Sequence, residues 1–277
     1  MAYTPYDWQQ TLRQKADYVE DRLRGGSPVA ALSCREGVLL LTTRRTQSKI
    51  FEIYDRLAFA GLGNPSDLEA VRHAAVDFAH AEGYQRSEQD VSIQRVVGFA
   101  ISPALKRSFA DPFRTPLVIR GLFAQVGEAP EEDLYYVLNY DGEFVLYHDY
   151  AAAAGTDFAE VLMERVLSGE GAPAPTPKRK SRRALPLEEG VQRALRAWSA
   201  GRWALQGAEG EGAPEPEPEP EPEDWEKTPL PPEEQLQRVL AESLEAERVE
   251  AALLERDPRR ERLLRFLTEE ELSAFLP

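Results

Sequence analysis

Residues 45–63 read RTQSKIFEIYDRLAFAGLG and contain two short apolar runs on either side of Asp55 and Arg56. Runs of this length around a polar turn are typical of two strands joined as a hairpin. Lys49 stands at the start of the first run. On these residues alone, three roles are open for Lys49: a catalytic base, a binding point for an anionic group, or a surface charge at the end of a strand.

A second predicted hairpin comes directly before the first. Two β-rich runs, residues 29–34 and 38–43, flank a short polar turn. A one-sided apolar pattern over residues 7–23 predicts a helix before these strands. After residue 63, the sequence Asn-Pro-Ser-Asp predicts the start of another helix, which ends near Gly83.

The middle of the chain continues as blocks of like elements. A helix is expected over residues 88–109, bent or ending near Pro103. The order of strands, helices, strands and helices favours antiparallel sheets layered with helices over an alternating parallel fold. The remaining expected strands are residues 116–126, 134–140 and 144–147, and the next helices are residues 158–167 and 187–203.

Two segments depart from the globular pattern. Residues 171–184 are Pro-rich with five basic residues, and residues 207–235 form a Pro-Glu-rich stretch with eleven acids and one lysine. The second stretch therefore carries ten of the fifteen net negative charges. We expect a basic loop insertion and an acidic disordered loop, because neither buries enough apolar surface to offset ordering. The basic run lacks interleaved aromatic residues, so we expect no nucleic-acid binding.

The last stretch, residues 243–276, allows two interpretations. Its Ala, Leu, Glu and Arg content favours helix throughout. Asp257 and Pro258 are a turn signal in its middle, and Val249 begins an alternating pattern. A strand hairpin followed by a short helix that starts at Thr268 is equally compatible with the pattern, and periodicity alone does not decide between the two.

Several classes of function find no support in the sequence. Cys34 is the one cysteine, which excludes an intramolecular disulfide and suits a reducing compartment. No run approaches the roughly 20 apolar residues of a membrane span, and the first ten residues lack the features of a signal peptide. We therefore expect a cytoplasmic protein without membrane contact. We also expect no metal site or cofactor, because no phosphate-binding loop occurs and the three histidines are scattered at positions 73, 80 and 148.

Ser27 raises one catalytic alternative. Cleavage after Gly26 would expose a serine whose own amine serves as the base of a hydrolase. Pro28 and the long helix expected before this position argue against such processing.

The order of elements and several motifs together resemble the α-type subunit of the bacterial proteasome core particle. The resemblance implies an α+β fold of the Ntn-hydrolase type: a four-layer α/β/β/α sandwich of two antiparallel sheets flanked by helices, with an N-terminal helix. It also implies one domain over residues 1–206 and 240–277, and strands at 249–255 and 263–267. The motifs are GGSPVAAL (25–32), CREGVLLLTTR (34–44), SKIFEIYDRLAFAGLGNPSDLEAVRHAAVDFAHAEGY (48–84), YYVLNYDGEF (135–144), AAGTDFAEVLMERVL (153–167), LPLEEGVQRALRAW (185–198) and VEAALLERDPRRERLLRFLTEEELSAFL (249–276).

The resemblance further implies that the chain is not catalytic. Catalytic β-type subunits of this threonine endopeptidase use a freed N-terminal threonine, an aspartate and a lysine in a Lys-Ile motif. In this sequence Ser27 stands at the threonine position and Thr43 at the aspartate position, and only Lys49 matches. The alternative is a free-standing Ntn hydrolase that uses a processed Ser27.

Family α subunits form heptameric outer rings that gate substrate entry into the particle for protein degradation. The resemblance assigns the gate to Ala2, Tyr3, Thr4, Pro5 and Tyr6. The implied partners are proteasome β subunits, neighbouring α subunits and an ATPase regulatory ring that inserts its C-terminal tails. The implied docking pocket consists of Lys49, which receives the tail carboxylate, and a wall formed by Gly26, Gly61 and Leu62.

Overall fold

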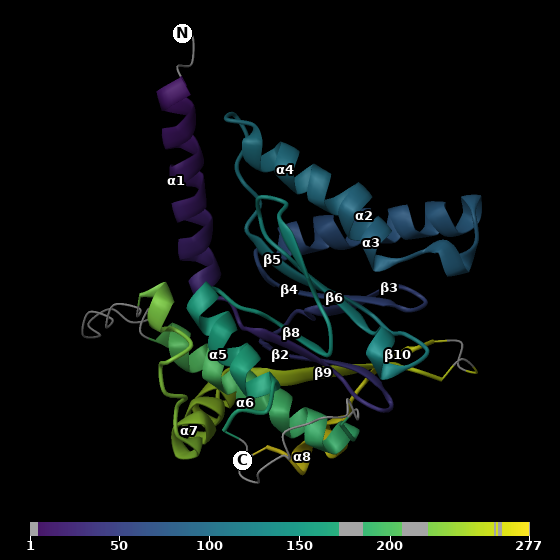
Figure 1. The fold of residues 1–277 in the computed structure, drawn as a ribbon, viewed down its shortest axis with the longest axis vertical. Helices are drawn as coiled ribbons and strands as arrows, with labels where there is room; N and C mark the ends of the chain where they lie inside the picture. Colours follow the sequence, from purple (N-terminus) through teal and green to yellow (C-terminus); the bar gives the residue numbers. More distant parts are fainter. Residues whose placement is uncertain (1–4, 172–184, 207–220, 258, 260–261, 277) are drawn as a thin grey trace.

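The computed structural model describes residues 5–171, 185–206, 221–257, 259 and 262–276. Two five-stranded antiparallel sheets pack face to face, and helices cover their outer faces (Figure 1). The strand order is β10-β9-β2-β1-β8 in the first sheet and β3-β4-β5-β6-β7 in the second. The predicted α/β/β/α sandwich is confirmed. Within the described parts of the chain, no helix is long and apolar enough to cross a membrane.

The first sheet combines the predicted hairpin with strands from later in the chain. Its strands are β1 (Val29–Ser33), β2 (Gly37–Arg44), β8 (Tyr150–Ala153), β9 (Arg248–Glu255) and β10 (Leu264–Phe266). The strands expected near 249–255 and 263–267 are confirmed, because β9 pairs with β2 along the whole length of β2 and β10 pairs with β9. Sequence reasoning missed β8, whose three alanines have low β-propensity. Pairing with β1, from Val29 opposite Ala153 to Leu32 opposite Tyr150, makes it a strand.

The second sheet contains the hairpin that carries Lys49. Its strands are β3 (Ile50–Tyr54), β4 (Leu57–Gly63), β5 (Ile119–Gln125), β6 (Leu134–Leu138) and β7 (Phe144–Tyr147). Strands β5 and β6 are shorter than predicted. At the end of β6 the chain turns instead of extending, since Asn139 N–H donates to Glu143 O and closes the loop to β7.

Helices α1 (Pro5–Arg24), α2 (Pro65–Gln85) and α3 (Ile93–Arg95) contact strands of the second sheet, and α4 (Ser102–Ala110) contacts α1 and the turn η2 between α3 and α4. The single helix predicted over 88–109 is wrong at its start. Residues Glu88–Asp90 form a separate 3₁₀ turn, and Ser92 caps a new helical segment. The π-helical turn η2 (Val96–Ile101) precedes Pro103, which has no N–H to continue an α-helical hydrogen-bond ladder.

Helices α5 (Asp157–Leu167) and α6 (Leu187–Leu205) cover the first sheet, and α7 (Glu233–Leu244) packs on α6. The 3₁₀ turn η5 (Pro222–Asp224) and the start of α7 fall inside the segment 207–235 that was expected to be an acidic disordered loop. Leu236, Val239 and Leu240 give α7 an apolar stripe at helical spacing, and all three are buried. Residues 172–184 and 207–220, with the rest of both predicted loops, lie outside the described residues.

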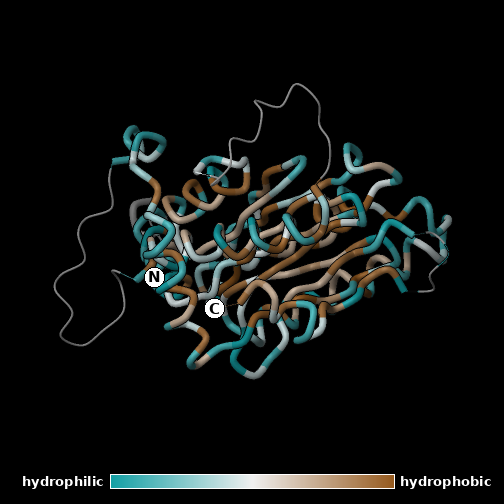
Figure 2. Tube along the Cα trace, turned by 90° about the horizontal axis from the view of Figure 1, so that it is seen from below, coloured by the Kyte–Doolittle hydropathy of each residue, from teal (hydrophilic) through white to brown (hydrophobic). Residues whose placement is uncertain are grey.

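Two apolar clusters hold the layers together. One fills the space between the sheets and beneath α2, and the other lies between the first sheet and the helices α5 and α6. Figure 2 shows apolar residues concentrated along the central strands. The short helix α8 (Glu269–Ser273) closes the described chain, and the expected cap at Thr268 is confirmed, since its hydroxyl accepts the Glu271 N–H.

A buried lysine ties α1 to the end of α4. Lys15 Nζ donates to Phe109 O at 3.2 Å and to Asp111 O at 2.5 Å, where a cation also complements the helix C-terminus.

Lys15→Met keeps most of the apolar stem but removes both charged hydrogen bonds, each of a kind that contributes about 1.5–3 kcal/mol. We expect faster hydrogen–deuterium exchange across Pro5–Arg24. The exposed Lys106 of α4 provides the control Lys106→Met, and equal exchange in both variants would contradict the anchoring role.

Candidate functional site

Lys49 lies directly before β3, where the two sheets come together. Its N–H donates to Glu250 Oε2 at 2.8 Å, and its carbonyl oxygen accepts the Gly61 N–H at 3.3 Å. Glu250 belongs to β9 of the first sheet, whereas Gly61 belongs to β4 of the second. The backbone of Lys49 is therefore held from both sheets.

The Lys49 side chain is half-buried. Among the described residues, no hydrogen bond or ion pair of its ammonium group is found. Burial lowers the pKa of Lys49, and the nearby Glu247 and Glu250 act against that effect. Arg202 and Arg45 lower the pKa further. A partly desolvated ammonium with its donors unused can bind an anionic oxygen strongly.

Gly26 and Leu62, two residues of the predicted pocket wall, pack closely together. A Cβ at Gly26 would lie 2.6 Å from Leu62 Cδ1 and 3.0 Å from the carbonyl oxygen of Leu23, so a larger residue here would have to displace the Leu62 side chain. Gly61 faces the other way: a Cβ there would meet Leu68 of α2 at 2.7 Å. Gly61 is thus joined to Lys49 by a backbone hydrogen bond, and the Cα of Gly61 faces α2.

Ser27 lies in a buried chain of hydroxyl groups near Lys49. Its Oγ accepts the Trp198 Nε1–H at 3.1 Å and the Thr43 N–H at 3.3 Å. Ser27 Oγ is also 2.8 Å from Thr43 Oγ1 and 3.2 Å from Thr42 Oγ1. Thr43 in turn donates its hydroxyl to Glu247. A general base must reach the nucleophile's proton, and the carboxylate in this chain contacts Thr43 instead of Ser27.

Sequence reasoning missed the two glutamates of this site. The side chain of Glu250 is 4% exposed, accepts the hydroxyl of Ser48 and lies 4.0 Å from Arg44 Nε. Glu247 accepts the Thr43 hydroxyl and lies 3.6 Å from Arg45 Nε. For Glu250 the signal in the sequence is a charged residue at a buried position of a strand, which is readable only once β9 is known to be a strand; Glu247 precedes β9 and has no such signal.

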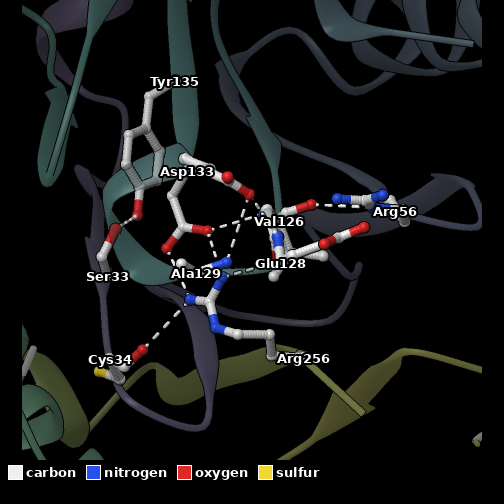
Figure 3. A network of polar contacts seen from close by, with 11 residues as sticks. Ser33, Cys34, Arg56, Val126, Glu128, Ala129, Asp133, Tyr135 and Arg256 are labelled. Atoms are coloured by element: carbon white, nitrogen blue, oxygen red, sulfur yellow. Dashed lines mark hydrogen bonds and ion pairs between the residues drawn. The ribbon is translucent and has the colours of Figure 1, made fainter. Parts of the chain in front are cut away.

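A second polar network lies at the other end of β9. The two Nη atoms of Arg256 each donate to Asp133 at 2.8 Å, and Asp133 also accepts the Gly127 N–H at 2.9 Å (Figure 3). Nearby, the hydroxyls of Ser33 and Tyr135 are 2.8 Å apart. Arg256 follows β9 of the first sheet and Asp133 precedes β6 of the second. This network therefore links the two sheets and holds β9, which carries Glu250 at its other end.

Comparisons with known proteins give consistent relatives. No family model matches the sequence. A protein named Proteasome subunit alpha from Actinosynnema mirum is 31% identical over 196 residues, which cover 70% of this chain and 68% of that relative. Proteins of the same name from Geodermatophilus obscurus and Xylanimonas cellulosilytica are 33% and 32% identical, over 59% and 58% of this chain and 58% and 65% of their own lengths.

Proposed function

Because this chain belongs to the proteasome α-subunit family, we propose that it is a non-catalytic subunit of a proteasome core particle. In this role it forms the outer heptameric ring with neighbouring α subunits, stacks on β subunits that carry the catalytic threonine, and gates substrate entry. It also docks an ATPase regulatory ring through that ring's C-terminal tails. The observation that carries the docking role is the half-buried Lys49 ammonium, which has no ion pair within the described ranges.

The docking proposal rests on the chemistry of a peptide C-terminus. A terminal carboxylate presents two oxygens to a cation, and such a charge-assisted hydrogen bond contributes about 1.5–3 kcal/mol. Lys49 supplies the cation, and its backbone is fixed by Glu250 and Gly61. We assign the pocket wall to Gly26, Gly61 and Leu62, because Gly26 and Leu62 pack together and Gly61 adjoins Lys49 through its N–H.

The gating proposal concerns Ala2, Tyr3, Thr4, Pro5 and Tyr6. The first three lie outside the described residues, and α1 begins at Pro5. Two features support a gate at this place. The N-terminal end of α1 lies away from both sheets (Figure 1), and Lys15 anchors the helix to α4. The contacts of Lys15 hold α1, and the proposed gate directly precedes and opens this helix in the sequence.

The assignment as a non-catalytic subunit is supported by the surroundings of Ser27. In the uncut chain the nitrogen of Ser27 is part of the peptide bond to Gly26, and the amine that would serve as base exists only after cleavage at that bond. Ser27 is 4% exposed. Its hydroxyl is surrounded by the hydroxyls of Thr42 and Thr43, the Thr43 N–H and the indole N–H of Trp198. A processed Ser27 hydrolase is the alternative.

An exposed apolar patch supports assembly with other subunits. It consists of Phe99 of η2 and Phe144 and Leu146 of β7, which are 39–67% exposed, and Val145, which is 56% exposed, lies on the other face of the same strand. Strand β7 is an edge strand of the second sheet, and a Cβ at Gly98 would lie 4.0 Å from the Phe144 ring. Apolar edge strands favour pairing with another chain, and contiguous apolar patches mark protein interfaces.

Co-expression with a proteasome β subunit tests the proposed function. We expect four stacked rings of seven-fold symmetry in negative-stain images and an intact mass that retains residues 1–26. The double variant Val145→Lys, Leu146→Asp is expected to lower ring yield, whereas Tyr84→Asp, at an exposed aromatic outside the patch, serves as control. A monomer whose mass lacks residues 1–26 would contradict the subunit role and support the Ser27 hydrolase.

A further inference from the structure

Glu250 connects the two sheets at the start of β3. It is paired within β9 opposite Thr42 of β2, so its backbone belongs to the first sheet. Its side chain nevertheless reaches the second sheet, where Oε2 accepts the Lys49 N–H at 2.8 Å and Oε1 accepts the Ser48 hydroxyl. The carboxylate of Glu250 is nearly fully buried and accepts hydrogen bonds from the consecutive residues Ser48 and Lys49. We call this pair of hydrogen bonds the clamp.

We propose that Glu250 is the positioning residue for Lys49, which it fixes through the backbone so that the ammonium group remains available for an incoming carboxylate. This inference rests on the proposed docking role of Lys49. A direct ion pair between the two side chains would occupy the ammonium and compete with the ligand. The observed geometry avoids this competition, because the Ser48 hydroxyl and the Lys49 N–H bind the two oxygens of Glu250, and the charged group paired with it is Arg44, at 4.0 Å, not the Lys49 ammonium.

The charge of Glu250 also matters at this place. Taking an ammonium out of water favours its neutral form, and a nearby negative charge favours the charged form. Glu250 and Glu247 therefore help Lys49 to stay protonated although it is partly buried, while Arg202 and Arg45 act in the opposite direction. Glu247 lacks the clamp, because its described partners are Thr43 and Arg45 and not the Lys49 backbone.

The strand β9 offers a matched control. Glu255 is a second buried glutamate on the same strand, and its carboxylate accepts from Arg265 of β10, at 3.1 Å, on the side away from β2. Glu255→Gln removes a buried charge from β9 without touching β3. Ser48→Ala provides a milder test, because Ser48 is exposed and its loss removes only one donor of the clamp.

The first measurement follows Lys49 directly in the full-length chain. ¹³C-dimethylation of lysines and NMR titration report the pKa of Lys49, with Lys49→Arg used to assign its signal. We expect Glu250→Gln to lower this pKa, because the variant removes a charge that favours the ammonium. Glu255→Gln is expected to leave it unchanged. An equal shift in both variants, or none in Glu250→Gln, would overturn the positioning role.

The second measurement uses an immobilised library of short random peptides that end in a free carboxylate, beside the same library ending in an amide. The wild-type chain is expected to prefer the carboxylate pool. Glu250→Gln should weaken this preference by about tenfold, the size of one misplaced charged hydrogen bond, and Ser48→Ala should weaken it less. If Lys49→Ala loses the preference and Glu250→Gln retains it, the inference fails while the docking role stands. If Lys49→Ala retains the preference, the docking role itself fails.

Discussion

Replacement of Arg256 by alanine is expected to lower the free energy of unfolding by about 3–5 kcal/mol. The substitution leaves Asp133, which is 0% exposed, without the guanidinium that pairs with both of its oxygens. A buried carboxylate without its partner bears its desolvation cost uncompensated. Arg256→Ala also removes a link between the sheets, since Arg256 follows a strand of the first sheet and Asp133 precedes a strand of the second (Figure 3). Urea unfolding of the full-length variant, followed by tryptophan fluorescence, measures the effect.

A neighbouring arginine provides the control for this prediction. Arg259 also pairs with an aspartate, Asp257, at 2.9 Å, but its side chain is 87% exposed. Exposed pairs are screened by water and contribute little. Arg259→Ala should therefore unfold almost like the wild type. Similar urea midpoints for Arg256→Ala and Arg259→Ala would show that the buried network does not hold the sheets together.

Lys49→Ala is expected to abolish the stimulation of protein degradation by the ATPase regulator while ring assembly is retained. The reason is that no other described cation combines partial burial with a backbone held by both β4 and β9. Degradation of a protein substrate is measured with assembled particles, with and without the ATPase ring. Native mass spectrometry of the same samples reports whether the rings form.

The control for Lys49→Ala is Arg45→Ala. Arg45 lies four positions before Lys49, and its side chain is 73% exposed. It therefore adds positive charge near the site but, unlike Lys49, is not buried. We expect it to preserve most of the stimulation. Stimulation that survives in Lys49→Ala would exclude the docking role, and an equal loss in both variants would indicate a diffuse charge effect in place of a defined pocket.

Local patterns alone were sufficient for much of the fold. Both hairpins of residues 29–63 followed from β-rich runs around polar turns, and α2 and α6 followed from apolar residues at helical spacing. Helix α7 was lost from the prediction because the acidic composition around it outweighed the three apolar residues of its buried stripe. The position of Lys49 at the start of a strand was readable as well. Its interpretation as a docking residue came from the family resemblance and remains a proposal.

The sequence by itself determined the elements whose neighbours along the chain decide their conformation: the two hairpins and the periodic helices α2 and α6. Only the tertiary structure decided β8 and β9, since alanine- and glutamate-rich segments become strands when a partner strand satisfies their backbone groups. It alone also placed Glu250 beside Lys49, 201 positions away. Burial and pairing between such distant residues arise from packing the two sheets together, so no local pattern encodes them.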